Sequence, residues 1–303
     1  MSCPDCFTGE LHEGDPRGTI TKAYGLDAYV TEPSNGEPAK GIIIMIPDAF
    51  GWEFVNLRLL ADKYADKGGY KVYLPDFMDG HSAPLSMLET MKTLNSSTGI
   101  LSKIYYGFLA AYDAIPWFIR NNPGKAMPRV KGFFEQLRKE EGETLPIGTA
   151  GFCWGGKYVV LLAQGLEING KPLIDAGFTG HPSLLSVPGD IQKITRPLSI
   201  AIGDKDSVLS VPQAQKVKGI LEGNEGPAKG RFASTRMPAM GSAFVRTLIA
   251  RILRGKLPSR MISVLTGSEA TSLLFDHCIH VGCALFWKVS DDIRVIKTEL
   301  ERL

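Results

Sequence analysis

A cysteine lies in the glycine-rich hexapeptide Gly-Phe-Cys-Trp-Gly-Gly at 151–156, between an apolar strand pattern and a helical pattern. This is the arrangement of a nucleophile elbow, a sharp strand-to-helix turn that projects a reactive side chain from the edge of a sheet. We expect strained backbone at Cys153, and glycines around it because a Cβ would collide with the neighbouring strand and helix. The helix N-terminus behind the sulfur favours the thiolate. The pattern predicts Cys153 as a nucleophile and the Trp154 amide as an oxyanion-hole donor. A small buried apolar cysteine is the alternative.

An acid that could orient a histidine follows a later strand pattern, 198–203. Two aspartates, Asp204 and Asp206, come directly after it. Asp204 is better placed to cap the turn, so Asp206 is the preferred catalytic acid. A solvated turn is the alternative interpretation of both residues.

Apolar runs that alternate with amphipathic patterns must position these residues. β-Branched or apolar runs predict strands, and apolar residues at helical spacing predict helices. Their alternation predicts an α/β fold with a doubly wound, mostly parallel sheet flanked by helices. We expect a domain over 1–256 and an atypical tail over 257–303, whose apolar residues follow no clean period. The predicted strands are 41–46, 70–74, 145–151, 173–179, 198–202 and 231–237; the predicted helices are 56–67, 85–94, 100–120, 128–141, 156–164, 211–221 and 242–256.

Composition excludes several classes of protein. The 303 residues include 34 Lys+Arg and 32 Asp+Glu, so a net charge of +2 gives no argument for nucleic acid or an anionic membrane. We find no apolar run near the ~18–20 residues of a membrane helix and no signal peptide. Five cysteines are few for this length and favour a reducing, cytoplasmic location. The Cys-x-x-Cys at 3–6 is only a weak zinc signal, so we predict no metal and no cofactor.

Several motifs, in order, resemble the dienelactone hydrolases of the α/β-hydrolase superfamily, in particular their fungal branch. The resemblance implies a Cys-His-Asp triad that opens small lactones or esters through an acyl-enzyme, with Cys153 as nucleophile and Asp206 as acid. It implies that Asp48 helps to set the ionisation of the thiol and that Ala49 gives the second oxyanion-hole amide. It also implies a role in fungal catabolism or secondary metabolism. We expect a monomer or a homodimer, and the sequence does not decide between them. The matching motifs are Ser-Cys-Pro-Asp-Cys-Phe at 2–7, Ile-Pro-Asp-Ala-Phe-Gly-Trp at 46–52, Tyr-Leu-Pro-Asp-Phe-Met at 73–78, the hexapeptide at 151–156, Phe-Thr-Gly-His-Pro-Ser at 178–183 and Gly-Asp-Lys-Asp at 203–206.

The chain departs from that pattern at the catalytic histidine. Ser242 occupies the slot where the family has a His-Gly-Phe loop, and serine cannot relay the proton. One explanation is that the histidine is lost. The other is an error in the gene sequence from about residue 230, such as a frameshift or a retained intron, which would also explain why the apolar residues of the tail follow no clean period. His181 follows a strand beside the elbow and His81 follows another strand. We expect both at the pocket, with a structural histidine or a plain loop residue as the alternatives. A pseudo-hydrolase that binds a small molecule or a partner is therefore the alternative function.

Overall fold

The structure, a computed structural model, describes residues 13–203, 206, 208–223 and 231–235. Its main sheet has eight strands, which include all six strands predicted from apolar runs. Two further short strands, β6 (Glu167–Ile168) and β7 (Lys171–Pro172), pair separately. The strands of the main sheet are β1 (Thr19–Ala23), β2 (Leu26–Thr31), β3 (Ile42–Ile46), β4 (Lys71–Pro75), β5 (Ile147–Phe152), β8 (Ala176–Gly180), β9 (Leu198–Gly203) and β10 (Arg231–Thr235).

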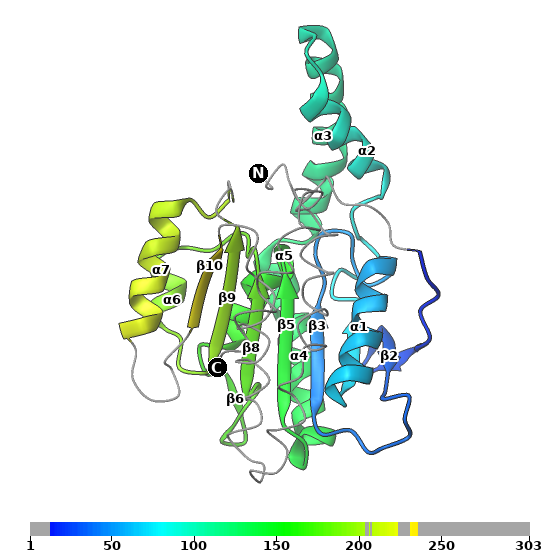
Figure 1. The fold of residues 1–303 in the computed structure, drawn as a ribbon, viewed down its shortest axis with the longest axis vertical. Coiled ribbons are helices and arrows are strands. Elements are labelled where there is room, and N and C mark those ends of the chain that lie inside the picture. The colour runs from blue at the N-terminus through cyan, green and yellow to red at the C-terminus, as the bar shows by residue number, and fades with distance from the viewer. Residues whose placement is uncertain (1–12, 204–205, 207, 224–230, 236–303) are drawn as a thin grey trace, which may run out of the picture.

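The strand order is β1-β2-β4-β3-β5-β8-β9-β10 (Figure 1). Every neighbouring pair from β4 to β10 is parallel, whereas β1 pairs with β2 and β2 with β4 in antiparallel fashion. The order reverses at β3, where the chain crosses from β4 to β5. This topology confirms the predicted doubly wound, mostly parallel sheet.

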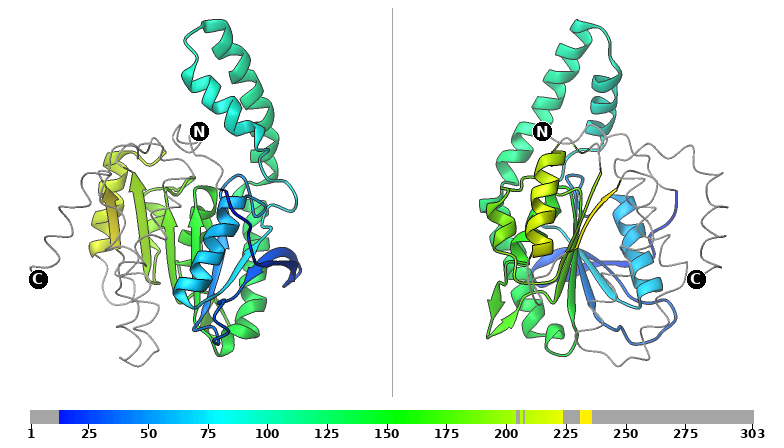
Figure 2. Two further views of the ribbon diagram at one scale, coloured as in Figure 1. Left: turned by 45° about the vertical axis from the view of Figure 1, so that its right-hand side comes forward. Right: turned by 60° about the vertical axis from the view of Figure 1, so that its left-hand side comes forward.

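Helices cover both faces of the sheet, with α1 on one face and α4, α5 and α7 on the other (Figure 2). The helices are α1 (Val55–Gly68), α2 (Ser86–Ser96), α3 (Ile100–Arg120), α4 (Pro123–Lys139), α5 (Trp154–Leu162), α6 (Gly189–Gln192) and α7 (Val211–Gly223), with a 3-10 turn η2 (Glu141–Glu143). None of the helices that the structure describes is long and apolar enough to cross a membrane.

The centre of the core lies where the elbow is built. Every residue of β3 and of β5 is buried, as a strand covered on both faces requires. All of α5 except Leu161 is also buried. The two elements that flank Cys153 are thus fixed by packing on all sides.

Helix α4 begins five residues before the predicted start at 128. Asn122 caps it, since its side chain accepts a hydrogen bond from the Lys125 amide, and Pro123 occupies the first helical position. Both are strong helix-start signals. The second proline, Pro128, lies inside the helix, so the prediction started it at the wrong proline.

The hairpin of α2 and α3 extends away from the sheet beyond the carboxyl ends of the strands (Figures 1 and 2). Only Ala110 and Trp117 of α3 are buried. The indole of Trp117 packs against that of Trp154, with ring centroids 6.4 Å apart. The C-terminal end of α3 is therefore anchored beside the elbow, while most of the helix is exposed.

Candidate active site

Cys153 adopts a conformation that few non-glycine residues adopt, with φ 49° and ψ −112°. Three backbone hydrogen bonds hold it there. Its amide donates to the Gly180 carbonyl at the end of β8 (3.2 Å), and its carbonyl accepts from the amides of Gly156 (3.1 Å) and Ser183 (2.9 Å). The strain is thus held by the neighbouring strand and the loop that follows it, as expected for an elbow.

The glycines around the cysteine are required by close packing. A Cβ on Gly155 would lie 2.2 Å from the carbonyl oxygen of Ile46 in β3. A Cβ on Gly151 would lie 2.6 Å from Cγ2 of Val159 in α5. Strand β5 and helix α5 can therefore approach each other and β3 closely only because these positions carry no side chain.

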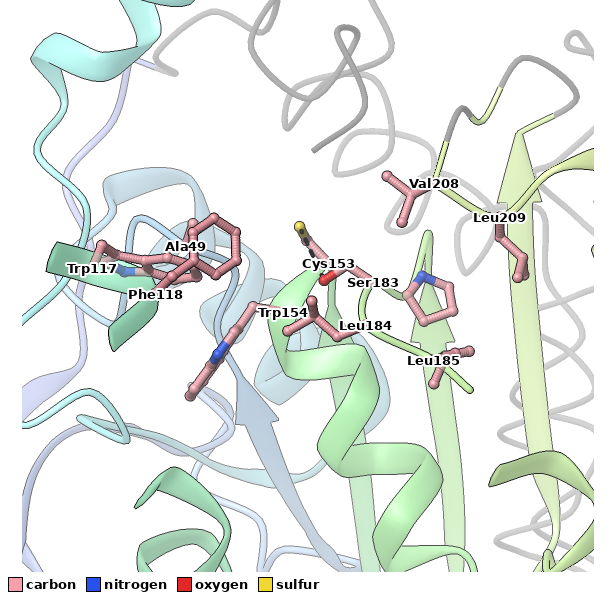
Figure 3. A pocket seen from close by; sticks show the side chains of 11 residues that line it. Ala49, Trp117, Phe118, Cys153, Trp154, Ser183, Leu184, Leu185, Val208 and Leu209 are labelled. Atoms are coloured by element: carbon pink, nitrogen blue, oxygen red, sulfur yellow. Dashed lines mark hydrogen bonds between the residues drawn. The ribbon is translucent and has the colours of Figure 1, made fainter. Parts of the chain in front are cut away.

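A cavity of about 320 Å³ opens above the elbow. In Figure 3 the Cys153 sulfur lies between Ala49 and Phe118 on one side and Val208 on the other. The Ser183 hydroxyl is 3.9 Å from that sulfur. Most of the lining residues have apolar side chains, but polar atoms form almost as much of the cavity surface as apolar atoms do, which suits a small ligand that carries both kinds of group. The lining residues are Ala49, Trp117, Phe118, Cys153, Trp154, Pro182, Ser183, Leu184, Leu185, Val208 and Leu209.

Both predicted oxyanion-hole residues line this cavity. Ala49 follows β3, and Trp154 begins α5 immediately after the cysteine. Their amides donate none of the hydrogen bonds found among the described residues. Both residues thus lie at the cavity wall beside Cys153, with amides that donate to no backbone acceptor among the described residues.

His181 is the imidazole beside the thiol. It follows β8 with φ 38°, and its amide donates to the Ala201 carbonyl in β9 (2.7 Å). Its side chain is hydrogen-bonded to that of Cys153. Burial lowers the pKa of His181, but this hydrogen bond and the negative charges of Cys153, Asp206 and Asp48 outweigh burial and raise the pKa. The site therefore favours the imidazolium beside a thiolate.

Asp206 lies close enough to His181 to influence it. The half-buried carboxylate accepts hydrogen bonds from the amides of Val208 (2.8 Å) and Leu209 (3.1 Å). These bonds fix its position in the loop after β9. Its charge contributes to the raised pKa of His181. Cysteine, histidine and aspartate from three neighbouring strand ends are thus brought together.

Asp48 is the second acid of the site and is only 2% exposed. One carboxylate oxygen accepts the Phe50 amide (2.9 Å), and the other has no hydrogen-bond partner among the described residues. Burial, with a smaller contribution from the negative charge of Cys153, raises the pKa of Asp48 to about 7. At neutral pH the carboxyl group is therefore divided between its charged and neutral forms.

Neither histidine candidate is among the residues that line the cavity. His181 lies beside the thiol, whereas His81 is exposed, and its carbonyl accepts a hydrogen bond from Asn121 Nδ2 (2.8 Å). Ser242 lies outside the described residues, as do His12, His277 and His280. Among the residues that the structure describes, no group of three His, Cys, Asp or Glu could hold a metal ion.

Much of the cavity wall was not predicted from the sequence. Trp117 and Phe118 come from the end of α3, and Leu184 and Leu185 come from the loop after β8. Ser183 belongs to a motif of the resemblance but carried no predicted role. The sequence does hold one signal for them. Two adjacent aromatic residues, Trp117 and Phe118, stand near the end of a long apolar helical pattern and indicate that this end of the helix meets the core.

Comparison with known proteins agrees with this geometry. Residues 26–229 match the Dienelactone hydrolase family. Two fungal relatives are hydrolase pyvD of Aspergillus violaceofuscus, 27% identical over 71% of this chain and 76% of the relative, and hydrolase tropI of Talaromyces stipitatus, 29% identical over 73% and 78%. The fold is similar to that of a Klebsiella pneumoniae protein assigned to the dienelactone hydrolases, with a TM-score of 0.51 and 16% identity over 89% of this chain and 98% of that one.

Proposed function

The chain belongs to the Dienelactone hydrolase family, and on that premise we propose that it hydrolyses a small lactone or ester with Cys153 as the nucleophile. One observation carries the proposal. The Cys153 thiol stands on a strained elbow at the cavity and is hydrogen-bonded to His181, whose pKa the neighbouring negative charges raise. A thiolate paired with an imidazolium is the reactive form of a catalytic cysteine.

The first half of the reaction forms an acyl-enzyme. The thiolate of Cys153 attacks the carbonyl carbon, and the electrons of the C=O bond move to oxygen. The amides of Ala49 and Trp154 donate to that oxyanion. When it collapses, the ring C–O bond breaks, and the imidazolium of His181 gives its proton to the departing alkoxide. In a lactone this alkoxide stays tethered, so the product is a hydroxy-acyl thioester.

The second half releases the product. Neutral His181 takes a proton from a water molecule, whose oxygen attacks the thioester carbonyl, and the C–S bond breaks. The thiolate and the imidazolium are restored, and one lactone plus one water has given one hydroxy acid. In this proposal Asp206 orients and stabilises the imidazolium. His181 replaces a histidine at position 242, which this sequence lacks.

The cavity supports a small substrate. Its volume of about 320 Å³ is near the lower end of ligand pockets. Leucine, valine and aromatic residues make up much of its lining, and none of the described residues that line it is a lysine or an arginine. We propose a neutral ring lactone or a short-chain ester, without a cofactor. The fungal hydrolases among the relatives support a role in fungal catabolism or secondary metabolism, and the low cysteine content supports the cytoplasm.

The alternative function is a pseudo-hydrolase that keeps the pocket and binds a small molecule or a partner. Only the serine at position 242 favours it. Without any working base, the rate is expected to fall by a factor on the order of 10⁴–10⁶. The cysteine would then react slowly and the bound ligand would be released unchanged.

The proposed function is tested in two assays. The first measures the release of p-nitrophenol from p-nitrophenyl acetate in the first turnover, and the second measures the hydrolysis of a panel of simple lactones. We expect a burst of about one equivalent, an acyl group on Cys153 by peptide mass spectrometry, and loss of both signals in Cys153→Ala. The control Cys6→Ala should keep them. If the wild type shows no burst and no acyl group on Cys153, the proposed function is rejected. Activity that appears only in Ser242→His, after the transcript has confirmed the serine, would establish the alternative.

A further inference from the structure

One side of α3 carries a stripe of large apolar side chains that the described part of the chain leaves uncovered. Leu101, Ile104, Phe108, Tyr112 and Ile115 are each between 59% and 79% exposed. They recur every three or four residues, so they share one side of the helix. Core residues of a helix would instead be buried, which makes this stripe an unpartnered surface.

No charge interrupts the stripe. The opposite side of α3 holds Ala110 and Trp117, which are buried against the rest of the protein. Lys103 and Asp113 lie five residues to either side of Phe108, and at 3.6 residues per turn this places them away from the stripe. The surface therefore suits another apolar surface and not a charged one.

The spacing of the stripe is the same in both directions from Phe108. Ile104 and Tyr112 lie four residues away on either side, and Leu101 and Ile115 lie seven residues away. A two-fold axis through Phe108 would place each of these residues against its symmetric counterpart on an antiparallel helix. We propose that α3 pairs antiparallel with α3 of a second copy of this chain, about a two-fold axis at Phe108.

The exposed area matches what such a dimer needs. With Tyr105 and Ile119, which are each 59% exposed, the stripe presents roughly 800–1,000 Å². A standard interface takes about 800 Å² from each partner, whereas the largest apolar patch of a typical monomer covers about 300–600 Å². The stripe is therefore too large for an ordinary monomer surface and large enough for a stable dimer.

A lipid surface fits the hairpin less well. Surface-binding helices carry a polar face rich in Lys and Arg, which attracts anionic lipids. The two helices hold the cations Lys92, Lys103 and Arg120 and the anions Glu89 and Asp113, a net charge of only +1. The side of α3 away from the stripe also packs on α2 and the body instead of meeting water. Charge thus favours a second copy.

The pairing would affect the cavity. Phe118 lines the cavity and follows Phe108, the residue on the two-fold axis, by ten residues. In the antiparallel pair it would therefore lie opposite the turn that precedes α3 of the second copy. The tip of one hairpin would then stand near the cavity mouth of the other. Each copy would narrow the entrance to its partner's site, so association would influence which substrates enter.

The oligomeric state of the full chain is the first test, by light scattering after gel filtration over a range of micromolar concentrations. We expect a dimer for the wild type and a monomer for Phe108→Asp, because the two-fold axis would place two carboxylates together. The control Lys103→Asp puts the same charge off the stripe and should leave the dimer intact. Circular dichroism confirms that each variant is folded. The proposal is rejected if the wild type is monomeric at 100 µM. If that monomer also sediments with anionic vesicles, the stripe binds a lipid surface and not a second copy.

Cysteine cross-linking tests the register. In a background with the five native cysteines replaced by serine, Phe108→Cys should form an intermolecular disulfide with itself under mild oxidation. The double variant Leu101→Cys/Ile115→Cys should also cross-link, whereas Leu101→Cys alone should not. Efficient cross-linking of Lys103→Cys instead would contradict the antiparallel stripe pairing. This serine background lacks the nucleophile, so its result is independent of the proposed hydrolysis.

Discussion

Asp48 and Cys153 are electrostatic neighbours in the site, and the negative charge of the thiolate helps to raise the pKa of the Asp48 carboxyl to about 7. Burial of Asp48 is the larger cause. Coupling of this kind is mutual, so an ionised Asp48 must also disfavour the thiolate. His181 opposes this effect because its positive charge stabilises both anions. The reactivity of the thiol thus depends on which of the two acids holds the proton.

Removing the charge of Asp48 should make the thiol more acidic. In Asp48→Asn we expect iodoacetamide to alkylate Cys153 faster than in the wild type at pH values above 7, where Asp48 of the wild type is ionised, and at a similar rate below that pH. Peptide mass spectrometry isolates the labelling of Cys153. The control Asp62→Asn changes a buried carboxylate that accepts a hydrogen bond from Tyr29 instead. Identical profiles for Asp48→Asn and the wild type would contradict the coupling.

The same carboxyl group should make the protein less stable as pH rises. The pKa of Asp48 is raised in the folded state from 3.8 to about 7, so between these values the folded state binds more protons than the unfolded state. The free energy of unfolding then falls with increasing pH across that window. At about 1.4 kcal/mol per pKa unit, the loss is on the order of 3–4 kcal/mol. Urea unfolding at pH 4.5 and 7.5 should show a smaller loss in Asp48→Asn, and an equal loss would be evidence against the raised pKa.

His181 should matter far more than His81 to the rate. We expect His181→Gln to lower kcat/KM for lactone or ester hydrolysis by a factor of about 10²–10⁴, because the proton transfers lose their acid and base. His81→Gln is the matched control, and its rate should stay near that of the wild type, since His81 is exposed and His181 is the histidine that interacts with the thiol. The pH profile of His181→Gln should also lose the limb that the imidazole titration produces. If both variants keep full activity, another group is the base.

Gly155 should not tolerate a methyl group. In Gly155→Ala the new Cβ would meet the Ile46 carbonyl at 2.2 Å, so strand or helix must shift, at a cost of about 3 kcal/mol. Gly132→Ala is the matched control, because Gly132 lies in α4 with nothing within 4 Å of the added Cβ. There the substitution should stabilise by roughly 0.5–1 kcal/mol through helix propensity. Chemical denaturation compares the two, and equal stabilities would show that the elbow packs less tightly than described.

The positions of Cys153 and Asp206 at the strand ends were predictable because they are encoded locally. Cys153 lies between glycines at a strand-to-helix junction, and Asp206 follows a buried strand, so short patterns suffice to place both. The hairpin β1–β2 was not predicted as strands. Four of the five residues of β1 are exposed, so the strand has no buried face that a pattern of apolar residues could mark. Its register depends on pairing with β2, which no local pattern records.

The side-chain positions in the cavity depend on long-range geometry. The contact of His181 with the thiol requires φ 38° at a residue after β8, and sequence does not specify that angle. The apolar pattern over 100–120 predicted a helix correctly, but the same pattern fits a buried helix. It gave no sign that most of α3 projects from the body while Trp117 and Phe118 reach the cavity.

The backbone bonds at Cys153 make the elbow independent of its sulfur. The amide and carbonyl of this residue are held by Gly180, Gly156 and Ser183, and none of these bonds involves the thiol. A chain with alanine at 153 should therefore keep an intact cavity that binds its natural ligand without cleaving it. Such a protein would serve as a capture reagent, because native mass spectrometry after incubation with a cell extract would weigh the retained molecule.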